Sequence, residues 1–566
     1  MFGLGLLISS VPFILPFRYF PNGDFFPDAA AIGLALLALV FGFRKFSFGR
    51  DCLLLLLISM LMLISGFVMR SYYYDVWVLP ALVIMFFAFF LAGIEALGTV
   101  SQERFSLGMQ SGILCGGGVS VLIGLAQYFE VTAWSGNVFI HSSGRVYGNL
   151  AQRNLYSTYL LIFSCVLCAV AVRYAIKSWL VVGALAVTAF LLAIAGSRMV
   201  LLDALVVVLV LAWLRRGRPA ERQLERFSFL FLSFLIALVA FQFISLFGGE
   251  GGASRITIAG DAPRVGEWLK GLRILMDHPL GVGFGNYAQA SFVYQLDAGV
   301  GSPITWSHSH SIVMQFLVEF GFLAVPLLII GILLGARMLY VALRADLDRV
   351  CFAICLIFLV VHSLLEYPLW YMNFLLLFVA LVGLARMGSA GGHKAASIRL
   401  GAGLALMVLI LVSYDYTRTL GYRTVDRQMK VNVDRMVDLL SVSLNPALAW
   451  SADRLLIEYL IPDGGPEAGY KLCQAMYMAQ REPLYPYLER VALMALADGK
   501  FDLTASVLKS RYAAYPELPD TYLKARIRYH WPDVADDYID KIESDRRAGF
   551  PGVDYYRLDI PAECSK

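Results

Sequence analysis

The sequence predicts an all-α polytopic membrane protein with a helical domain at its C-terminal end. Of the 566 residues, 59% are hydrophobic and 16% are charged, whereas soluble domains are about one quarter charged. The charges are unevenly placed, because 42 of the 88 Lys, Arg, Asp and Glu residues lie in residues 416–566. We therefore predict a transmembrane domain over residues 1–415 and a polar helical domain over residues 416–566. The net charge of +4 is too small to indicate binding to nucleic acid.

A membrane-spanning helix needs about 20 mostly apolar residues. Thirteen runs of the chain meet or approach this requirement, so we expect about 13 transmembrane helices. The first run has no basic start and no small-residue cleavage site, which favours a retained span over a signal peptide. The runs lie at 3–17, 28–43, 52–69, 75–95, 107–127, 156–173, 178–195, 199–214, 228–247, 310–336, 350–365, 368–387 and 400–416.

The Lys and Arg residues predict the orientation, because cytoplasmic loops are enriched in both. A cytoplasmic N-terminus puts 17 of the 26 basic residues of the first 415 in cytoplasmic loops. Thirteen spans then place residues 416–566 outside the cytoplasm, where Cys473 and Cys564 could form a disulfide. The other six Cys lie in apolar runs, where we expect small buried side chains and no metal site.

One short segment, 141–154, is predicted to lie outside the cytoplasm and yet contains Arg, which is normally enriched in cytoplasmic loops. It reads HSSGRVYGNLAQRN, contains Arg145, and enters a span through Gln152, Arg153 and Asn154. Free N–H groups at a helix start favour an anion there. The alternative is an interfacial cap whose Arg side chains reach the lipid headgroups.

Arg198 lies in a second outer segment, the tight turn Gly196-Ser197-Arg198 between two apolar runs. A planar guanidinium suits bidentate binding of a phosphate. Anchoring among headgroups explains the same position equally well, so this feature alone leaves both interpretations open.

The long outer loop 248–309 contains two further candidates. Charged residues from Arg264 to Arg273 recur at three- and four-residue steps, which predicts an amphipathic interfacial helix. The glycines at 281, 283 and 285 follow no strand pattern, so we expect a turn there. The loop ends in WSHSHS, with Trp306, His308 and His310 at the membrane edge. No carboxylate or Cys has the spacing of a third metal ligand, so a general base or hydrogen-bond donor is favoured over a metal site.

The fourth segment, HSLLEYPLWY, begins at His362 and forms a hairpin broken by Pro368. Tyr and Trp are common at membrane interfaces, so Tyr367 has an ordinary explanation. Glu366 has no such ordinary explanation, because an ionisable side chain inside the membrane region usually has a function. Glu319 lies deeper in another span, about half a helical turn away from the face of His310, and is expected to pair with a neighbouring helix.

These outer residues together suggest an anionic, lipid-linked substrate such as a lipid diphosphate sugar. Its diphosphate is already a leaving group. An enzyme acting on it needs Arg to stabilise the developing charge and a base to take the proton of the acceptor.

Three motifs carry a resemblance to a known family. The segment WSHSHSIVMQFLVEFGF (306–322) resembles the signature of the O-antigen ligase and polymerase (Wzy-C) superfamily. HSLLEYPLWYMNFLLLF (362–378) and YGNLAQRNLYSTYL (147–160) resemble, more narrowly, the bacterial pilin-type protein O-oligosaccharyltransferases of the PglL/PilO type.

The resemblance implies a multi-pass enzyme of the bacterial inner membrane that faces the periplasm and needs no metal or other cofactor. It implies en bloc transfer of an oligosaccharide from undecaprenyl diphosphate to Ser or Thr of type IV pilin or another exported protein. Family-critical positions fall on Gln152, His310 and Tyr367, with His308 as second choice. The diphosphate-binding positions fall on Arg198 and Arg264, and after them on Arg153. Ser311 departs from the family pattern, where Asn is common.

The tail predicts one tetratricopeptide-like helix pair over residues 485–516, with Gly499 at the turn. One pair cannot bury its own apolar face, so the rest of the tail or the membrane domain has to cover it. The pair could dock the acceptor protein, or it could be a packing cap over the outer loops.

Three other functions remain open. An O-antigen ligase would transfer the glycan to lipid A core, and a polymerase would transfer it to another carrier-linked glycan. A transporter for lipid-linked glycans is expected to show internal repeats with charged residues near the bilayer midplane, and neither is evident in this sequence.

Overall fold

A computed structural model describes most of the chain. The described residues are 1–19, 22–69, 73–131, 133, 138–140, 146–217, 221–244, 262–298, 305–386, 392–420, 433–516 and 518–564. Within these ranges the fold is helical, and the one β-bridge joins Phe46 to His393. Arg145 and His141, two residues of the predicted outer segment, lie outside the described residues.

The predicted all-α polytopic fold is confirmed. Ten described helices are long and apolar enough to cross a membrane. Three more of the thirteen predicted spans correspond to α1, α8 and α16, which are helices of 13, 19 and 15 residues. The helices of this part of the chain are α1 Phe2–Ile14, α2 Phe25–Leu37, α3 Arg50–Val68, α4 Tyr74–Glu95, α5 Thr99–Tyr128, α6 Arg153–Arg173, α7 Ser178–Ala195, α8 Met199–Gly217, α9 Arg222–Ile244, α11 Ala262–Asp277, α12 Tyr287–Ala298, α13 Ile312–Phe320, α14 Ala324–Ala342, α15 Leu347–Leu365, α16 Met372–Arg386 and α17 Ala396–Leu420.

The chain divides into two compact units. The first contains residues 1–61, 80–260 and 326–414, and the second contains residues 62–79, 261–325 and 415–566. The polar tail therefore shares a unit with α11, α12 and α13.

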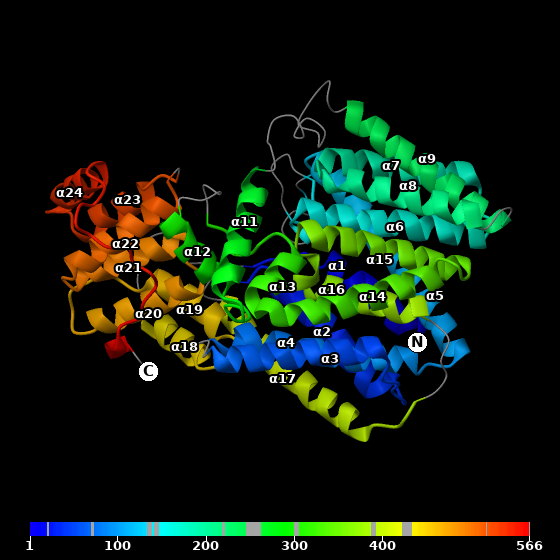
Figure 1. The fold of residues 1–566 in the computed structure, drawn as a ribbon, viewed down its shortest axis with the longest axis horizontal. Coiled ribbons are helices and arrows are strands. Elements are labelled where there is room, and N and C mark those ends of the chain that lie inside the picture. Colours follow the sequence, from blue (N-terminus) through cyan, green and yellow to red (C-terminus); the bar gives the residue numbers. More distant parts are fainter. Residues whose placement is uncertain are drawn as a thin grey trace. The chain divides into compact units, whose positions relative to one another are not determined.

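Small residues allow close helix packing in the first unit. A Cβ on Gly5 of α1 would lie 2.5 Å from the carbonyl oxygen of Phe105 on α5, and Cβ atoms on Gly108 and Gly112 would overlap the backbone of α1. Glycines four residues apart are a common means of close approach between membrane helices. In Figure 1, α6 lies between α7 and α15, and it is the most buried of the ten candidate spans.

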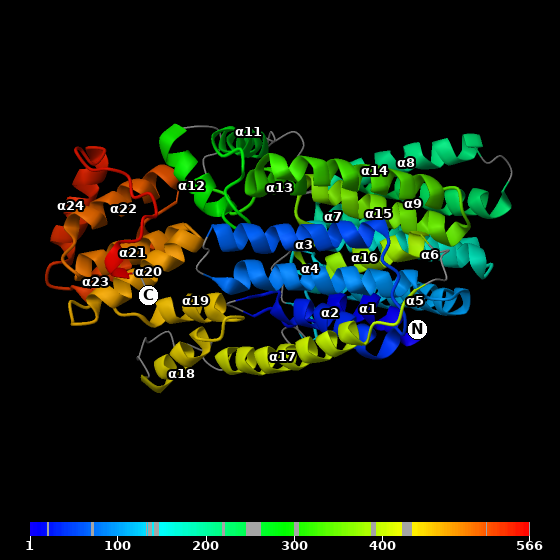
Figure 2. The same ribbon diagram turned by 60° about the horizontal axis from the view of Figure 1, so that its bottom comes forward.

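The tail continues the helical pairing in the second unit. The predicted pair is confirmed as α21 Tyr485–Ala497 and α22 Phe501–Ala514, joined at Gly499 with φ +73°. Neighbouring tail helices pack against each other in the same way (Figure 2). Cys473 and Cys564 form a disulfide with a Cα–Cα distance of 5.3 Å. The other tail helices are α18 Val433–Ser443, α19 Ala449–Tyr459, α20 Ala468–Arg481, α23 Thr521–His530 and α24 Ala535–Arg547.

The tail is joined to the rest of its unit by an apolar core and by an ion pair. Phe292 and Leu296 of α12 lie in one buried cluster with residues of α20, α21 and α22. Arg557 forms a bidentate ion pair with Asp297, with N···O distances of 2.5 and 2.9 Å. The helices covering the predicted pair are thus tail helices together with α12.

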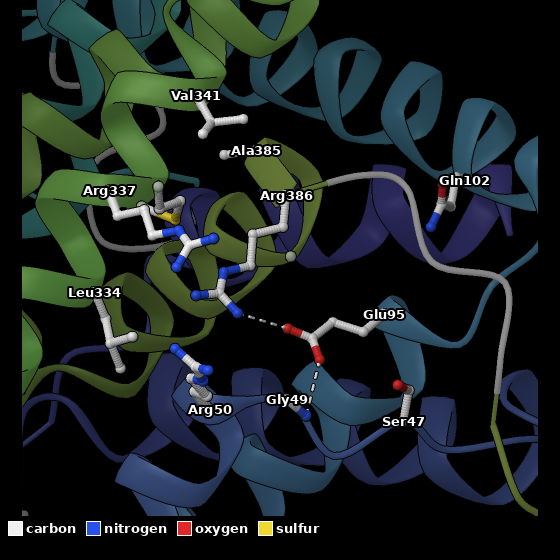
Figure 3. Close-up of a pocket in the computed structure, with 12 residues that line it drawn as sticks. Ser47, Gly49, Arg50, Glu95, Gln102, Leu334, Arg337, Val341, Ala385 and Arg386 are labelled. Carbon is white, nitrogen blue, oxygen red and sulfur yellow. Dashed lines mark hydrogen bonds and ion pairs between the residues drawn. The ribbon is translucent and has the colours of Figure 1, made fainter.

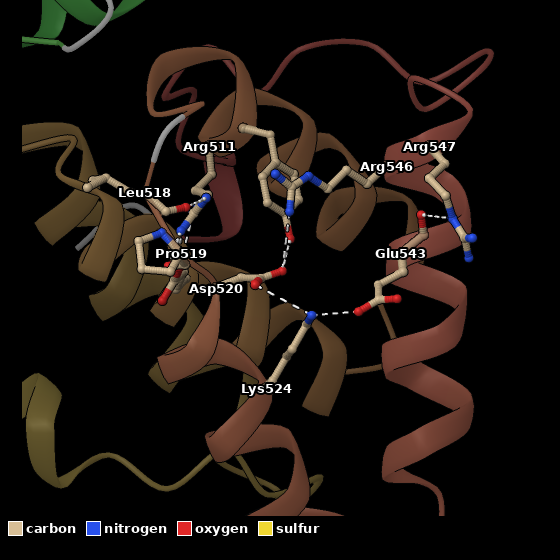
Figure 4. Close-up of polar contacts among 10 residues, drawn as sticks. Arg511, Leu518, Pro519, Asp520, Lys524, Glu543, Arg546 and Arg547 are labelled. Atoms are coloured by element: carbon tan, nitrogen blue, oxygen red, sulfur yellow. Dashed lines mark hydrogen bonds and ion pairs between the residues drawn. The ribbon is translucent and has the colours of Figure 1, made fainter.

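Charged side chains tie the last tail helices together (Figure 4). Buried Arg511 contacts the Glu489 carboxylate at 2.9 Å and donates to the carbonyl oxygens of Leu518 and Pro519. Farther out, the Lys524 ammonium lies 2.5 Å from Glu543. Because Arg511 is fully buried, its donors have to be satisfied by protein groups.

Candidate functional site

The backbone that leads into α6 is held by a buried glutamine of α5. The side-chain oxygen of Gln127 accepts hydrogen bonds from the N–H groups of Tyr147, at 3.1 Å, and Gly148, at 2.8 Å. Gly148 has φ +57°, and a Cβ there would lie 2.8 Å from the ring of Tyr156. The chain then turns, and Gln152 is the N-cap of α6. This agrees with the helix start that the sequence predicts at Gln152, Arg153 and Asn154.

Asn154 joins three segments that are far apart in the sequence. Its amide nitrogen donates to the Glu366 carboxylate at 3.2 Å, and its amide oxygen accepts from the Ser197 hydroxyl at 2.8 Å. Glu366 is 5% exposed, so the amide partly compensates for its burial. The start of α6, the turn before α8 and the hairpin after α15 therefore meet at one end of the first unit.

This end presents cations and an unsatisfied polar atom. Arg153 and Arg198, each next in sequence to a member of the Asn154–Ser197 contact, are half-buried. The buried side-chain oxygen of Gln152 has no hydrogen-bond partner within the described residues. Buried polar atoms are usually paired in proteins, so Gln152 is positioned to hydrogen-bond a ligand or an ordered water.

His362 and Tyr367 lie at the same end with different environments. The His362 Nδ1 is 2.7 Å from the Thr158 hydroxyl, and the residue is 1% exposed. The Tyr367 ring stacks on Tyr371, with 5.9 Å between centroids. Burial raises the pKa of Tyr367, and the neighbouring Glu366 raises it further. Tyr367 is therefore a neutral phenol that can donate a hydrogen bond.

The histidine pair belongs to the second unit. The His310 ring lies 4.0 Å from the Trp306 ring and 4.1 Å from the His308 ring, between centroids. His310 has φ +53°, in the left-handed region that is uncommon for residues other than glycine. Such a conformation costs about 1–3 kcal/mol and persists only where surrounding contacts enforce it.

Ser309, between the two histidines, supplies those contacts. Its N–H donates to the Gln315 side chain at 2.9 Å, and its carbonyl accepts from the Trp268 indole at 2.9 Å. Its hydroxyl donates to the Ser311 carbonyl at 2.8 Å. Ser309 is fully buried. Neither Ser309 nor Gln315 stands out from the sequence alone, where the available signal is a glutamine inside an apolar run.

Gln315 extends this network to the glycine turn. Its amide nitrogen donates to Glu319 at 2.9 Å, and the same carboxylate oxygen accepts from the Gly285 N–H at 3.0 Å. Gly281, Gly283 and Gly285 all have positive φ, so the expected turn is confirmed. Glu319 also accepts a backbone hydrogen bond from Tyr287 of α12 and interacts with the charge of Arg481 of α20, so the expectation that it pairs with a neighbouring helix is confirmed.

The helix expected from Arg264 onward is α11, but part of its charge is buried. The Lys270 ammonium lies 2.7 Å from Glu267, and Glu267 also accepts from Tyr287 and Ser291 of α12. Burial lowers the pKa of Lys270. Glu267 and Lys270 therefore fasten α11 to α12, while Arg264 remains half-buried in the first turn.

The predicted site residues thus fall into two clusters, one in each unit. We call them the Asn154 cluster and the His310 cluster. The Asn154 cluster contains Gln152, Arg153, Asn154, Arg198, His362, Glu366 and Tyr367, and the His310 cluster contains Arg264, Trp306, His308 and His310.

Tertiary structure also creates a thiol cluster that the sequence did not indicate. Sulfur atoms of Cys165 on α6 and of Cys351 and Cys355 on α15 lie within 4.8 Å of one another, and all three residues are buried. Thiols are ligands for soft metals. Cys168, three residues after Cys165 on α6, is not part of this group.

Two family models match the chain. One, described as O-antigen ligase, matches residues 183–329 and so includes Arg198, Arg264 and both histidines of the His310 cluster. The other, described as virulence factor membrane-bound polymerase, C-terminal, matches residues 350–526. No curated protein matches the chain. The chain is therefore a multi-pass membrane protein that is similar to O-antigen ligases over residues 183–329 and to a membrane-bound polymerase over residues 350–526.

Proposed function

We propose that the protein transfers an oligosaccharide en bloc from undecaprenyl diphosphate to a Ser or Thr hydroxyl of type IV pilin or another exported protein. The proposal places it in the bacterial inner membrane, with the chemistry and the tail on the periplasmic side. The Cys473–Cys564 disulfide supports this placement, because disulfides persist in the periplasm and are rare in the cytoplasm.

The observation that carries the proposal is the enforced geometry of His310. A strained backbone conformation held by a fully buried neighbour is typical of functional residues. A neutral imidazole can take the proton of an acceptor hydroxyl. The hydroxyl oxygen then bonds to the anomeric carbon of the glycan, the bond from that carbon to the diphosphate oxygen breaks, and undecaprenyl diphosphate leaves.

Arg residues supply the positive charge that stabilises undecaprenyl diphosphate as it leaves. We assign donor binding to Arg198 and Arg264, assisted by Arg153 and by Arg145, which lies outside the described residues. Guanidinium groups bind phosphate oxygens in bidentate fashion and stabilise the negative charge that develops on departure. This role requires no metal ion. Gln152 and the neutral phenol of Tyr367 are assigned to hydrogen bonds with the donor.

The test is co-expression with a pilin and a lipid-linked glycan, followed by intact-mass measurement of the pilin. We expect His310→Ala to abolish the mass increase while the protein stays in the membrane. His278→Ala is the matched control, because His278 is an exposed histidine of the same unit and should leave transfer unchanged. Normal glycosylation by His310→Ala would refute the assignment of the base.

A second candidate, polymerisation of lipid-linked glycan, is favoured by the polymerase family model over residues 350–526. The same experiment separates the candidates. A longer glycan on the lipid carrier with unmodified pilin would identify a polymerase, and glycan on lipid A core would identify an O-antigen ligase.

A further inference from the structure

The first unit contains a cavity of about 560 Å³ that none of the predicted site residues line. Its walls come from the start of α3, the ends of α4, α14 and α16, and the start of α5. α16 runs from the hairpin that carries Tyr367 to this cavity, so its 15 residues separate the two by about 20 Å. The cavity therefore lies at the opposite end of the bundle from the Asn154 cluster.

Three arginines line this cavity. Figure 3 shows the guanidinium groups of Arg50, Arg337 and Arg386 turned toward one another. Arg386 is neutralised by Asp51, at 2.5 Å, and by Glu95, at 3.5 Å. In the described part of the chain, neither Arg50 nor Arg337 has a recorded ion pair or side-chain hydrogen bond. Three arginines thus face two carboxylates here, and the surplus positive charge favours an anion between Arg50 and Arg337.

A buried amide adds a hydrogen-bonding group to the same wall. Gln102 of α5 is 5% exposed and lines the cavity. Its side chain has no recorded hydrogen bond to any described residue. Because buried amides are normally paired, Gln102 is available to donate to an oxygen of a bound group.

The opposite wall is apolar and continues onto a lipid-facing surface. Leu334, Met338 and Val341 of α14 line the cavity. Val341 is 52% exposed, and Ile332 and Leu333 of the same helix are 65% and 64% exposed. A ligand with a phosphate group and an adjoining hydrocarbon chain matches both walls.

We propose that this cavity binds the phosphate group of an anionic phospholipid from the leaflet at this end of the bundle, with Arg50 and Arg337 holding the phosphate. Basic pockets between membrane helices are suited to such headgroups. The topology predicted from the basic residues makes this the cytoplasmic leaflet. The acyl chain lies along Leu334 and Val341, which a free phosphate would leave uncovered.

The experiment compares the full-length protein with Arg50→Gln/Arg337→Gln in nanodiscs of phosphatidylcholine containing phosphatidylglycerol, with bound lipid counted by native mass spectrometry. We expect the double variant to retain phosphatidylglycerol at least about tenfold more weakly, because it removes both arginines that hold the phosphate. Arg215→Gln/Arg216→Gln is the matched control. It removes the same charge from exposed positions in the last turn of α8 and should not change lipid retention.

A second variant and a second ligand sharpen the result. Leu334→Trp keeps all three arginines, places a bulky ring against the apolar wall where the acyl chain is expected to lie, and should also weaken retention of phosphatidylglycerol. Equal retention by the wild type and the double variant would overturn the proposal. Thermal stabilisation of the detergent-solubilised wild type by inorganic phosphate alone, lost in the double variant, would overturn the lipid assignment and identify a site for a free anion.

Discussion

Replacing Gln315 with methionine tests whether the histidine loop is positioned by the network below it. Methionine keeps the length of the side chain but removes both hydrogen-bonding groups. Among the described residues the fully buried Ser309 N–H then has no partner left, which costs about 1–3 kcal/mol. Glu319 loses one hydrogen bond but keeps the Gly285 N–H, at a cost of about 1 kcal/mol.

The sum, at least about 2 kcal/mol, is comparable to the cost of the left-handed backbone at His310. If the ordered conformation of the loop is destabilised by about 2 kcal/mol, the fraction of molecules in that catalytically competent conformation falls by about 30-fold. We therefore expect Gln315→Met to lower the rate of glycan transfer by about 30-fold. The measurement is the time course of pilin modification in proteoliposomes, at equal amounts of folded enzyme.

Ser307→Ala is the control, because Ser307 is exposed in the same loop and surface changes are usually within about 0.5 kcal/mol. The reasoning is refuted if Gln315→Met transfers glycan within about twofold of the wild type while His310→Ala is inactive. In that case His310 does not depend on the network for its position.

Three further predictions concern the tail. Arg511→Met leaves the buried Glu489 carboxylate without its cation and should destabilise the protein by about 3–5 kcal/mol in denaturant unfolding, with part of the loss recovered when Glu489→Leu is added. Reduction of the disulfide Cys473–Cys564, which spans 91 residues, should remove about 4–5 kcal/mol and lower the melting temperature, whereas reductant should have no effect on Cys473→Ser/Cys564→Ser. Burial lowers the pKa of His530 from 6.5 to about 4, with help from nearby Arg side chains. Because the unfolded chain then binds a proton that the folded chain does not, stability should fall as pH drops from about 6.5 to 4, and His530→Gln should flatten that slope in melting curves.

The sequence by itself determined the fold class, because long apolar runs have few structural alternatives in a membrane. It also located the start of α6 at Gln152, the tight turn at Arg198 and the helix pair around Gly499, since these depend on local caps and turns. The pairing of Cys473 with Cys564 could be predicted from the sequence, because the other six Cys lie in apolar runs. Each of these features depends on residues close together in the chain or on composition.

Only the tertiary structure decided which polar groups meet. The Asn154–Glu366 contact spans 212 residues, and no local pattern links its partners. The burial of Glu267 and Lys270 depends on α12, and the thiol cluster depends on how α6 and α15 pack. The fixing of Ser309 by Gln315 and Trp268 likewise combines two helices with a loop. Such contacts follow from long-range packing of helices, which hydropathy and spacing do not encode.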